Sequence, residues 1–553
     1  MLEKPAAKCY NTFVKITAQP CGFRKAYTMR KTIATVLALA LALGLWGCGD
    51  SEEGGRFQYD IPAAISSLDP QFATEDAAKS VLSNCMEGLL RQRADGSVSY
   101  ALAEGSTTSA DEKTHTFTLR QGLKWADGTP LTAHDFVFAL RRHFGPGVVS
   151  PYAADFMMIE NAKAVLAGEQ PPSALGIEAS DDYTLVIRLE APSAFLGQLL
   201  SSTAALPCNE AFFQSTRGRY GTGPASLLSN GAFALTGWSE EKLTLQKNEK
   251  YYEAEGVLPQ SVTFQIGRED PEQQLLSGRS HAGAIAHDRL KEAVEAGLTY
   301  EPFDNTVWAL CFNQQKPAFA DREMRAALQM SVDRQQLAEK LQEGFISTSQ
   351  FIPPASLIFD KPYRQQAGQA VSPPYNPETA RELFRQTLEA QGRKKLDSVT
   401  ILVPERANQI YYASFIQQMW QRNLSLYVNI QQLPQQELSK KVAAGDYDIA
   451  ILPFTSNRPD PSGLLGQFVS GAAGNLTGYA DGEYDLTVSQ AEASGTVQEM
   501  VRLFAKAEDL LLSEAVVVPL YFETTCFAMG KGVLGVEYSP YSGKLFFHHA
   551  RLG

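Results

Sequence analysis

The sequence lacks the short motifs that mark many enzymes and metal sites. It contains no Cys-x-x-Cys pair, no Gly-x-Ser-x-Gly elbow, no His-Glu-x-x-His helix and no phosphate-cradling glycine loop. The first absence argues against a zinc site or a thiol redox site. The others argue against a serine hydrolase, a zinc protease and a nucleotide site. We therefore expect no catalytic residues, no metal and no cofactor.

The sequence also lacks an apolar run long enough to span a membrane. Residues 33–47 carry no charge and follow the basic pair Arg30-Lys31, but a spanning helix needs roughly 20 apolar residues. This architecture predicts a secretion signal rather than a membrane anchor. Because a basic region normally opens such a signal, Met29 is the predicted true start.

The apolar segment closes with Leu45-Trp46-Gly47-Cys48. This run resembles the bacterial lipobox, in which the cysteine becomes the lipidated first residue of the mature protein. The resemblance implies a signal over residues 1–47, lipidation of Cys48, a flexible tether over 48–56, and a place on the outer face of the cytoplasmic membrane or in the periplasm. The alternative is an ordinary signal peptide with an incidental cysteine.

Positive charge is scarce. The chain has 49 Lys and Arg against 61 Asp and Glu. Residues 1–47 hold seven of the bases and one of the acids, so the mature chain carries about −18 (42 minus 60). Such a surface repels phosphates, and nucleic acid is excluded as a partner.

Cysteine is rare as well. Only Cys85, Cys208, Cys311 and Cys526 follow Cys48, far apart in sequence. One or two disulfides or single buried thiols are both compatible with this spacing. The 553 residues, 44% of them hydrophobic, exceed what one core holds and predict two or three globular domains.

Residue patterns predict several elements. Alternating apolar residues predict strands, apolar residues at helical spacing predict helices, and Asp333 and Asn376-Pro377 are typical helix starts. The order strand, helix, strand over 398–430 predicts an α/β lobe, and a late apolar strand is expected to cross back to the first lobe. The predicted strands are 57–61, 114–119, 183–189, 242–246, 398–403, 425–430, 447–450 and 516–522; the predicted helices are 78–90, 132–141, 321–330, 333–341 and 410–423.

One composite turn and helix start is unusually specific. It reads Lys124-Trp125-Ala126-Asp127-Gly128-Thr129-Pro130-Leu131-Thr132-Ala133-His134-Asp135. Asp127-Gly128 supplies a turn with positive φ, and Asp135 can satisfy amides in the first helical turn. We interpret these residues as scaffold rather than as ligand contacts.

With further strings in the same order, this segment resembles the extracellular solute-binding proteins of oligopeptide and dipeptide ABC importers, family 5. The other strings are Leu68-Asp69-Pro70, Glu87-Gly88-Leu89-Leu90, Ala101-Leu102-Ala103-Glu104, Phe117-Thr118-Leu119-Arg120, Ser229-Asn230-Gly231-Ala232-Phe233 and residues 321–333. They span nearly the whole mature chain.

The resemblance implies a two-lobed, type II periplasmic-binding-protein fold of the α/β class, with an additional α+β domain inserted in the first lobe. Lobe I would comprise residues 55–87, 204–303 and 515–553, the extra domain 88–203, and lobe II 304–514. Two crossing segments would join the lobes, which close on ligand like a hinge.

The resemblance further implies an extended peptide enclosed between the lobes and paired through its main chain. The implied ligand-binding residues lie in the stretch after Leu68-Asp69-Pro70, at Tyr152, upstream of the strand 447–450, and in the stretch that follows that strand. They are Thr74, Glu75, Asp76, Tyr152, Gln435, Phe454, Thr455, Ser456, Asn457, Arg458 and Asp460.

At three of these places the sequence departs from the family. The usual Gly-Trp is Pro453-Phe454, a site tryptophan is Gln435, and the aspartate that pairs with the peptide α-ammonium is Asn457. Losing that charge-assisted bond costs about 1.5–3 kcal/mol. Either Asp460, Asp76 or Glu75 replaces it, or the ligand has no free amino terminus. In a third reading, Asn457 and Arg458 only decorate a surface loop.

The expected function is therefore a non-enzymatic, monomeric lipoprotein that captures short peptides and delivers them to the transmembrane subunits of an ABC permease. A receptor that hands a peptide pheromone or signal to a membrane partner is the alternative from another class, and a secreted hydrolase is a third. Within the family, a nickel complex, haem or an oligosaccharide could replace the peptide.

Overall fold

The computed structural model describes residues 55–62, 64–93, 96–145, 150–359, 361–370, 372–456, 458–472, 474–541 and 543–553. Gly54–Gly553 form one compact unit. The predicted signal with its start at Met29, Cys48, most of the tether and Asn457 lie outside the described residues. The predictions about them stay predictions.

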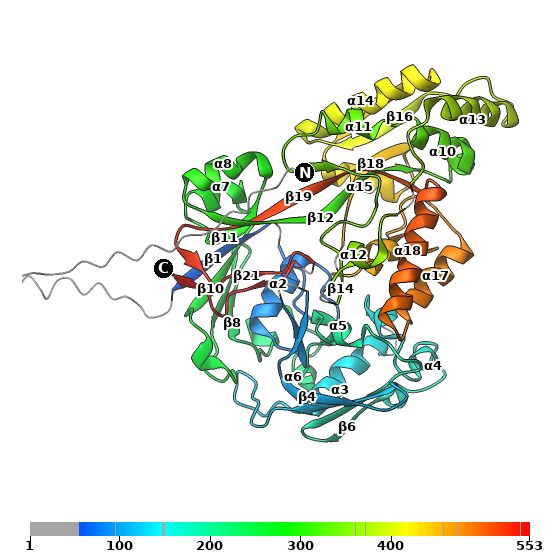
Figure 1. The fold of residues 1–553 in the computed structure, drawn as a ribbon. Helices are drawn as coiled ribbons and strands as arrows, with labels where there is room; N and C mark the ends of the chain where they lie inside the picture. Colours follow the sequence, from blue (N-terminus) through cyan, green and yellow to red (C-terminus); the bar gives the residue numbers. More distant parts are fainter. Residues whose placement is uncertain are drawn as a thin grey trace, which may run out of the picture. The chain divides into compact units, whose positions relative to one another are not determined.

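One mixed sheet runs through the unit, and its first half we call lobe I (Figure 1). The strand order there is β11-β1-β10-β9-β8. β1 is parallel to β10, whereas β9 pairs antiparallel with both β10 and β8. Phe57, Val262 and Phe264 lie in the core beneath these strands. The bounds are β1 (Arg56–Ile61), β8 (Phe233–Trp238), β9 (Lys242–Lys247), β10 (Ser261–Ile266) and β11 (Ala282–Ile285).

Two long strands carry the sheet from lobe I into a second half, lobe II. They are β12 (Thr299–Phe312) and β19 (Val517–Met529), which pair antiparallel. β11 pairs with one end of β19, and β18 (Ile449–Thr455) pairs with the other end of β12. The β12–β19 register shifts between Phe303 and Thr306. A second shift lies between Trp308 and Ala309, and such irregularities bend a ladder locally. The predicted strand 516–522 that crosses back is confirmed and extends to Met529.

Lobe II has helices on both faces of its sheet (Figure 1). Because strand side chains alternate, Trp308, Leu310 and Phe312 enter one core, while Val307 and Ala309 enter another. The first core also holds side chains of α10, α13 and α14, and the second those of α15, α17 and α18. The bounds are β16 (Val399–Pro404), β17 (Val428–Leu433), α10 (Arg322–Met330), α13 (Pro377–Ala390), α14 (Ala407–Leu424), α15 (Gln435–Ala443), α17 (Gly482–Glu492) and α18 (Val497–Ser513).

A separate four-stranded antiparallel sheet, in the order β4-β5-β7-β6, marks the extra domain. Its helix α3 (Ala133–Arg141) begins as predicted: the side chain of Thr132 and that of Asp135 form a reciprocal capping box. The Asp127 carboxylate accepts from the Thr129 amide at 2.9 Å. The scaffold interpretation of this string is confirmed. The strands are β4 (Ala103–Thr108), β5 (Thr114–Leu119), β6 (Ile177–Asp181) and β7 (Thr184–Arg188).

A buried ion pair joins the extra domain to lobe I. Arg142, at the end of α3, donates Nη1 to Asp69 Oδ1 at 3.0 Å and Nη2 to Asp69 Oδ2. Its guanidinium also lies over the Phe213 ring, 4.2 Å from the centroid. Asp69 belongs to the string Leu68-Asp69-Pro70, so this part of the family pattern is scaffold too.

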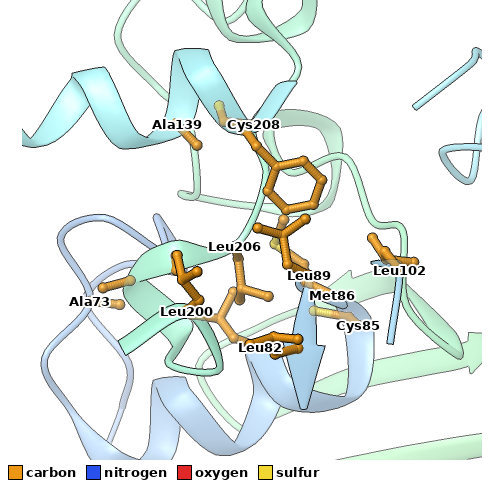
Figure 2. Packing of buried hydrophobic residues seen from close by; sticks show 14 of the residues in the cluster. Ala73, Leu82, Cys85, Met86, Leu89, Leu102, Ala139, Leu200, Leu206 and Cys208 are labelled. Carbon is orange, nitrogen blue, oxygen red and sulfur yellow. The ribbon is translucent and has the colours of Figure 1, made fainter. Parts of the chain in front are cut away.

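The apolar side of that junction lies along α2 (Asp76–Cys85). Figure 2 shows Leu82 and Cys85 of α2 beside Leu200 and Leu206, with Ala139 of α3 near Cys208. α5 (Leu196–Leu200) supplies Leu200. One continuous core therefore holds α2, α3 and α5 together.

Several predicted elements differ from the structure in their limits; the strand predicted over 425–430, for example, is β17, over 428–433. The helix predicted over 78–90 is α2, which ends at Cys85, and the chain then enters the short strand β2 (Leu90–Gln92). The helix predicted over 333–341 is the shorter α11 (Arg334–Ala338), although Asp333 does cap it. The strand predicted over 447–450 is β18, which starts at Ile449 and continues to Thr455. Local patterns locate helix starts better than their ends, because side-chain caps sit at the starts.

The four cysteines in the described residues are free and buried. Burial raises the pKa of both Cys85 and Cys208 to about 12, so these thiols are protonated at neutral pH. We expect none of the four in residues 49–553 to react with an aromatic disulfide reagent in the native state, and all four to react in 6 M guanidinium. A native reaction with any of them, or fewer than four thiols after unfolding, would contradict the buried-thiol arrangement.

Candidate functional site

A cavity of about 620 Å³ opens where the extra domain, α2 with the C-terminal segment, and lobe II meet. This volume is typical of small-ligand sites, which range from about 300 to 1,000 Å³. Charged side chains of both signs line it. Its polar and charged lining includes Lys79, Gln92, Tyr152, Asp155, Lys163, Glu190, Gln198, Ser201, Arg458, Glu492 and Lys544.

Tyr152, a predicted site residue, lies in the wall of this cavity. Its hydroxyl donates to the carbonyl oxygen of Ala73, directly before Thr74. Burial raises the pKa of Tyr152 to about 12, and the carboxylates of Asp155, Asp76 and Glu75 add to the shift. The structure thus brings Tyr152 and the predicted stretch 74–76 together.

The stretch 74–76 forms the start of α2. Thr74 and Asp76 are exposed, and Asp76 pairs with Lys79 at 3.0 Å. Glu75 accepts from the Ser66 hydroxyl at 2.6 Å through Oε1, while its Oε2 is buried without a partner among the described residues. Residues 74–76 do not line the cavity, whereas Lys79, which follows them on α2, does.

The second predicted stretch begins inside β18 rather than after the strand. Phe454 is 3% exposed and packs on Phe351 and Phe468, with ring centroids 5.4 and 5.5 Å away, so its side chain belongs to a lobe II core. Thr455 is exposed and shares a hydrogen bond with Thr306 at 2.8 Å. Ser456 is buried and braces the turn by accepting from the Arg458 amide at 3.1 Å.

Arg458 links lobe II to the extra domain. Its Nη2 lies 3.1 Å from Asp155 Oδ1, and its Nη1 lies 3.6 Å from Glu492 Oε1. Asp155 follows Tyr152 in the extra domain, and Glu492 ends α17 in lobe II. Arg458 thus bridges two walls of the cavity, and its assignment as a ligand contact stays a prediction.

Three carboxylates, those of Asp155, Glu492 and Asp460, face the single cation of Arg458. Burial raises the pKa of Asp155 against the opposing effect of Arg458. Burial likewise raises the pKa of Glu492, with Arg458 opposing and with Asp460 and Asp155 adding to the shift. Asp460 is 1% exposed, and its Oδ1 accepts from the Ser462 amide at 2.9 Å. This cluster would gain from a bound cation.

Gln435 lies elsewhere in lobe II. It is the first residue of α15, is exposed, and donates to Ser439 at 3.4 Å. Among the described residues, the cavity lining includes neither Gln435 nor the predicted residues Thr74, Glu75, Asp76 and Asp460. Their assignment as ligand contacts stays a prediction.

Of the described lining residues, only Tyr152 and Arg458 were predicted from the sequence. Four of the charged ones that were missed are Lys79, Asp155, Glu492 and Lys544. Asp155 had a usable signal, since it lies three residues after the predicted Tyr152. The other three belong to segments with no distinctive local pattern.

An aromatic side chain also joins the two sides of the cavity. Phe195, which precedes α5, is 7% exposed and belongs to a lobe II core, 6.4 Å from the ring of Phe504. This contact and the Arg458–Asp155 ion pair both join the extra domain to lobe II.

The family model of the bacterial extracellular solute-binding proteins, family 5 (middle), matches residues 97–475. The chain belongs to this family. It is therefore an extracytoplasmic solute-binding protein and not an enzyme, and the predicted two-lobed type II fold with an extra domain is confirmed.

Individual relatives agree along nearly the whole chain. The dipeptide-binding protein DppE of Bacillus subtilis (strain 168) is 27% identical, over 91% of this chain and 96% of the relative. The periplasmic murein peptide-binding protein MppA of Escherichia coli (strain K12) is 30% identical, over 85% of this chain and 88% of its own. The solved substrate-binding domain of an oligopeptide ABC transporter from Bacillus anthracis str. Ames has a TM-score of 0.73 at 26% identity, covering 90% of this chain and 99% of that one.

Two negative findings concern the described residues only. Within them, no group of three or more His, Cys, Asp or Glu side chains is placed to hold a metal ion. No helix in the same part of the chain combines the length and apolarity needed to cross a membrane.

Proposed function

We propose that this chain captures short peptides with a free amino terminus in the 620 Å³ cavity and delivers them to an ABC importer. One observation carries the proposal: the cavity presents carboxylates from two sides at Arg458 and ammonium groups elsewhere in its wall. A zwitterion can satisfy both, whereas an uncharged or purely anionic solute leaves one set unpaired. The peptide-binding names of the relatives support the same ligand class.

The α-ammonium of the peptide lies between Asp155 and Glu492 in this proposal. Both carboxylates line the cavity, both have raised pKa values, and neither is fully compensated by Arg458. The ammonium thus binds next to Arg458, which in sequence follows the position where the family pattern has an aspartate and this chain has Asn457. Residues 55–87, 204–303 and 515–553, residues 88–203 and residues 304–514 remain our proposed boundaries of lobe I, extra domain and lobe II.

Delivery requires a protein held near its permease. We propose that a lipid on Cys48 anchors a monomer at the membrane, with residues 48–56 as the tether. The lobes close about a hinge at the register shift between Phe303 and Thr306, and this closure presents the loaded form to the transmembrane subunits.

Native mass spectrometry of freshly purified residues 49–553 tests the ligand class. We expect a heterogeneous set of adducts with the masses of short peptides, removed by partial unfolding and restored by a defined tripeptide. After the tripeptide binds, small-angle scattering is expected to give a radius of gyration no larger than that of the stripped protein. A single adduct with the mass of a metal complex, haem or a sugar would overturn the peptide proposal.

A further inference from the structure

Lys544 is a buried cation in the cavity wall whose role the family pattern does not explain. It is 7% exposed, and its Nζ donates to the carbonyl oxygen of Ser201 at 3.0 Å. Among the described residues, no carboxylate lies within 4 Å of that ammonium, although most buried charges in proteins are paired. Burying an unpaired ammonium group lowers the stability of the fold unless a negative group compensates the charge.

The segment that carries Lys544 is held firmly against α2. Ser80 Oγ donates to the carbonyl oxygen of Gly543 at 3.0 Å, and Asn84 Nδ2 donates to that of Leu545 at 2.6 Å. Asn84 Oδ1 also accepts from the Phe547 amide at 3.0 Å. The backbone on both sides of Lys544 is thus fixed, so its side chain cannot leave for solvent by a small shift of the loop.

The charges that face Lys544 explain its state. Burial lowers the pKa of Lys544 to about 8, Glu87 opposes the shift, and the nearby Lys79 adds to it. Lys544 is therefore still cationic at pH 7. Glu87 is itself bound by Arg91 and Tyr251, whose hydroxyl donates to it at 2.9 Å. Lys79 lines the same cavity, and among the described residues its ion-pair partner is the exposed Asp76. Two ammonium groups therefore line one cavity.

We propose that Lys544, with Lys79 beside it, binds the terminal carboxylate of the peptide. This inference rests on the proposed function and deepens it. With the ammonium at Asp155 and Glu492, it gives the ligand one direction in the cavity. It also restricts the cargo to peptides short enough for both termini to fit inside, because a longer chain would place its carboxylate outside.

Isothermal titration with a tripeptide and its C-terminal amide tests the assignment. At pH 7 we expect the amide to bind wild type at least about tenfold more weakly than the acid, since a charge-assisted pair is lost. Lys544→Met should weaken binding of the tripeptide acid by a similar factor and leave binding of the amide unchanged. Lys291→Met, on the exposed surface of α8 (Leu290–Glu295), should keep the wild-type preference.

A purely structural role predicts something different. If Lys544 only capped α5 through Ser201, Lys544→Met would lower the melting temperature and weaken acid and amide equally. We expect instead a melting temperature at pH 7 no lower than that of wild type, because the variant buries no charge. Equal binding of acid and amide by wild type would overturn the Lys544 assignment alone. Failure of every peptide to bind would overturn the proposed function and this assignment with it.

Discussion

Replacing Asp69 with alanine is expected to lower the free energy of unfolding by about 3–5 kcal/mol, the cost of breaking a buried ion pair. The Asp69 and Arg142 side chains are 12% and 9% exposed. Without the carboxylate, the guanidinium would stay among the rings of Phe72, Phe213 and Tyr220. Its side-chain hydrogen-bond partners would then be Gln71 and the Cys208 sulfur. Urea unfolding followed by tryptophan fluorescence measures the change.

Two variants control this experiment. Glu382→Ala breaks the exposed pair with Arg385 on α13 and should leave the unfolding midpoint unchanged, since solvent screens that pair. Asp69→Ala with Arg142→Leu removes both charges and should recover most of the loss. An Asp69→Ala protein as stable as Glu382→Ala would mean that the pair does not hold the extra domain to lobe I.

Acetylating the amino terminus of a bound peptide is expected to weaken its binding about 10- to 100-fold. The acetyl group removes the charge that faces Asp155 and Glu492, and charge-assisted hydrogen bonds contribute about 1.5–3 kcal/mol. Glu492→Gln should weaken binding of the free-amine peptide about tenfold, at the low end of that range. The reason is that the Glu492 side chain is 42% exposed before the ligand arrives. The same variant should bind the acetylated peptide as wild type does.

Glu483→Gln is the matched control, at the other end of α17, where Glu483 pairs with Lys506 at 2.6 Å. It should bind both peptides as wild type does. Equal affinity of wild type for free and acetylated peptides would show that the ammonium is not recognised at this cluster. The alternative without a free amino terminus would then hold.

Local chemistry made part of the fold predictable. The Thr132–Asp135 capping box, the Asp333 cap and the Asn376 cap each depend on residues within four positions of one another, and all three form. Strands such as 57–61 and 114–119 follow from alternation alone. The limits of β18 were missed because Pro453 signals a strand end, yet it lies within the strand opposite Trp308.

The family pattern predicted part of the site. Tyr152 and Arg458 both came from that pattern, and both line the cavity. Phe454 came from the same pattern, but its side chain packs into a core, because in this register its face of β18 points toward Phe351. The face that a strand residue takes is set by its position in the strand and by the pairing register, and the sequence alone does not show that register.

By itself, the sequence determined the family, the class of fold, the scaffold role of its most specific string and the absence of catalytic chemistry. These depend on neighbours in sequence or on many weak matches added along the chain. The tertiary structure alone decided which charges meet. Arg458 and Asp155 are 303 positions apart, and Lys544 reaches Ser201 from 343 positions away. An ionic group acts through distance and burial in space, and neither is written in the spacing of residues along the chain.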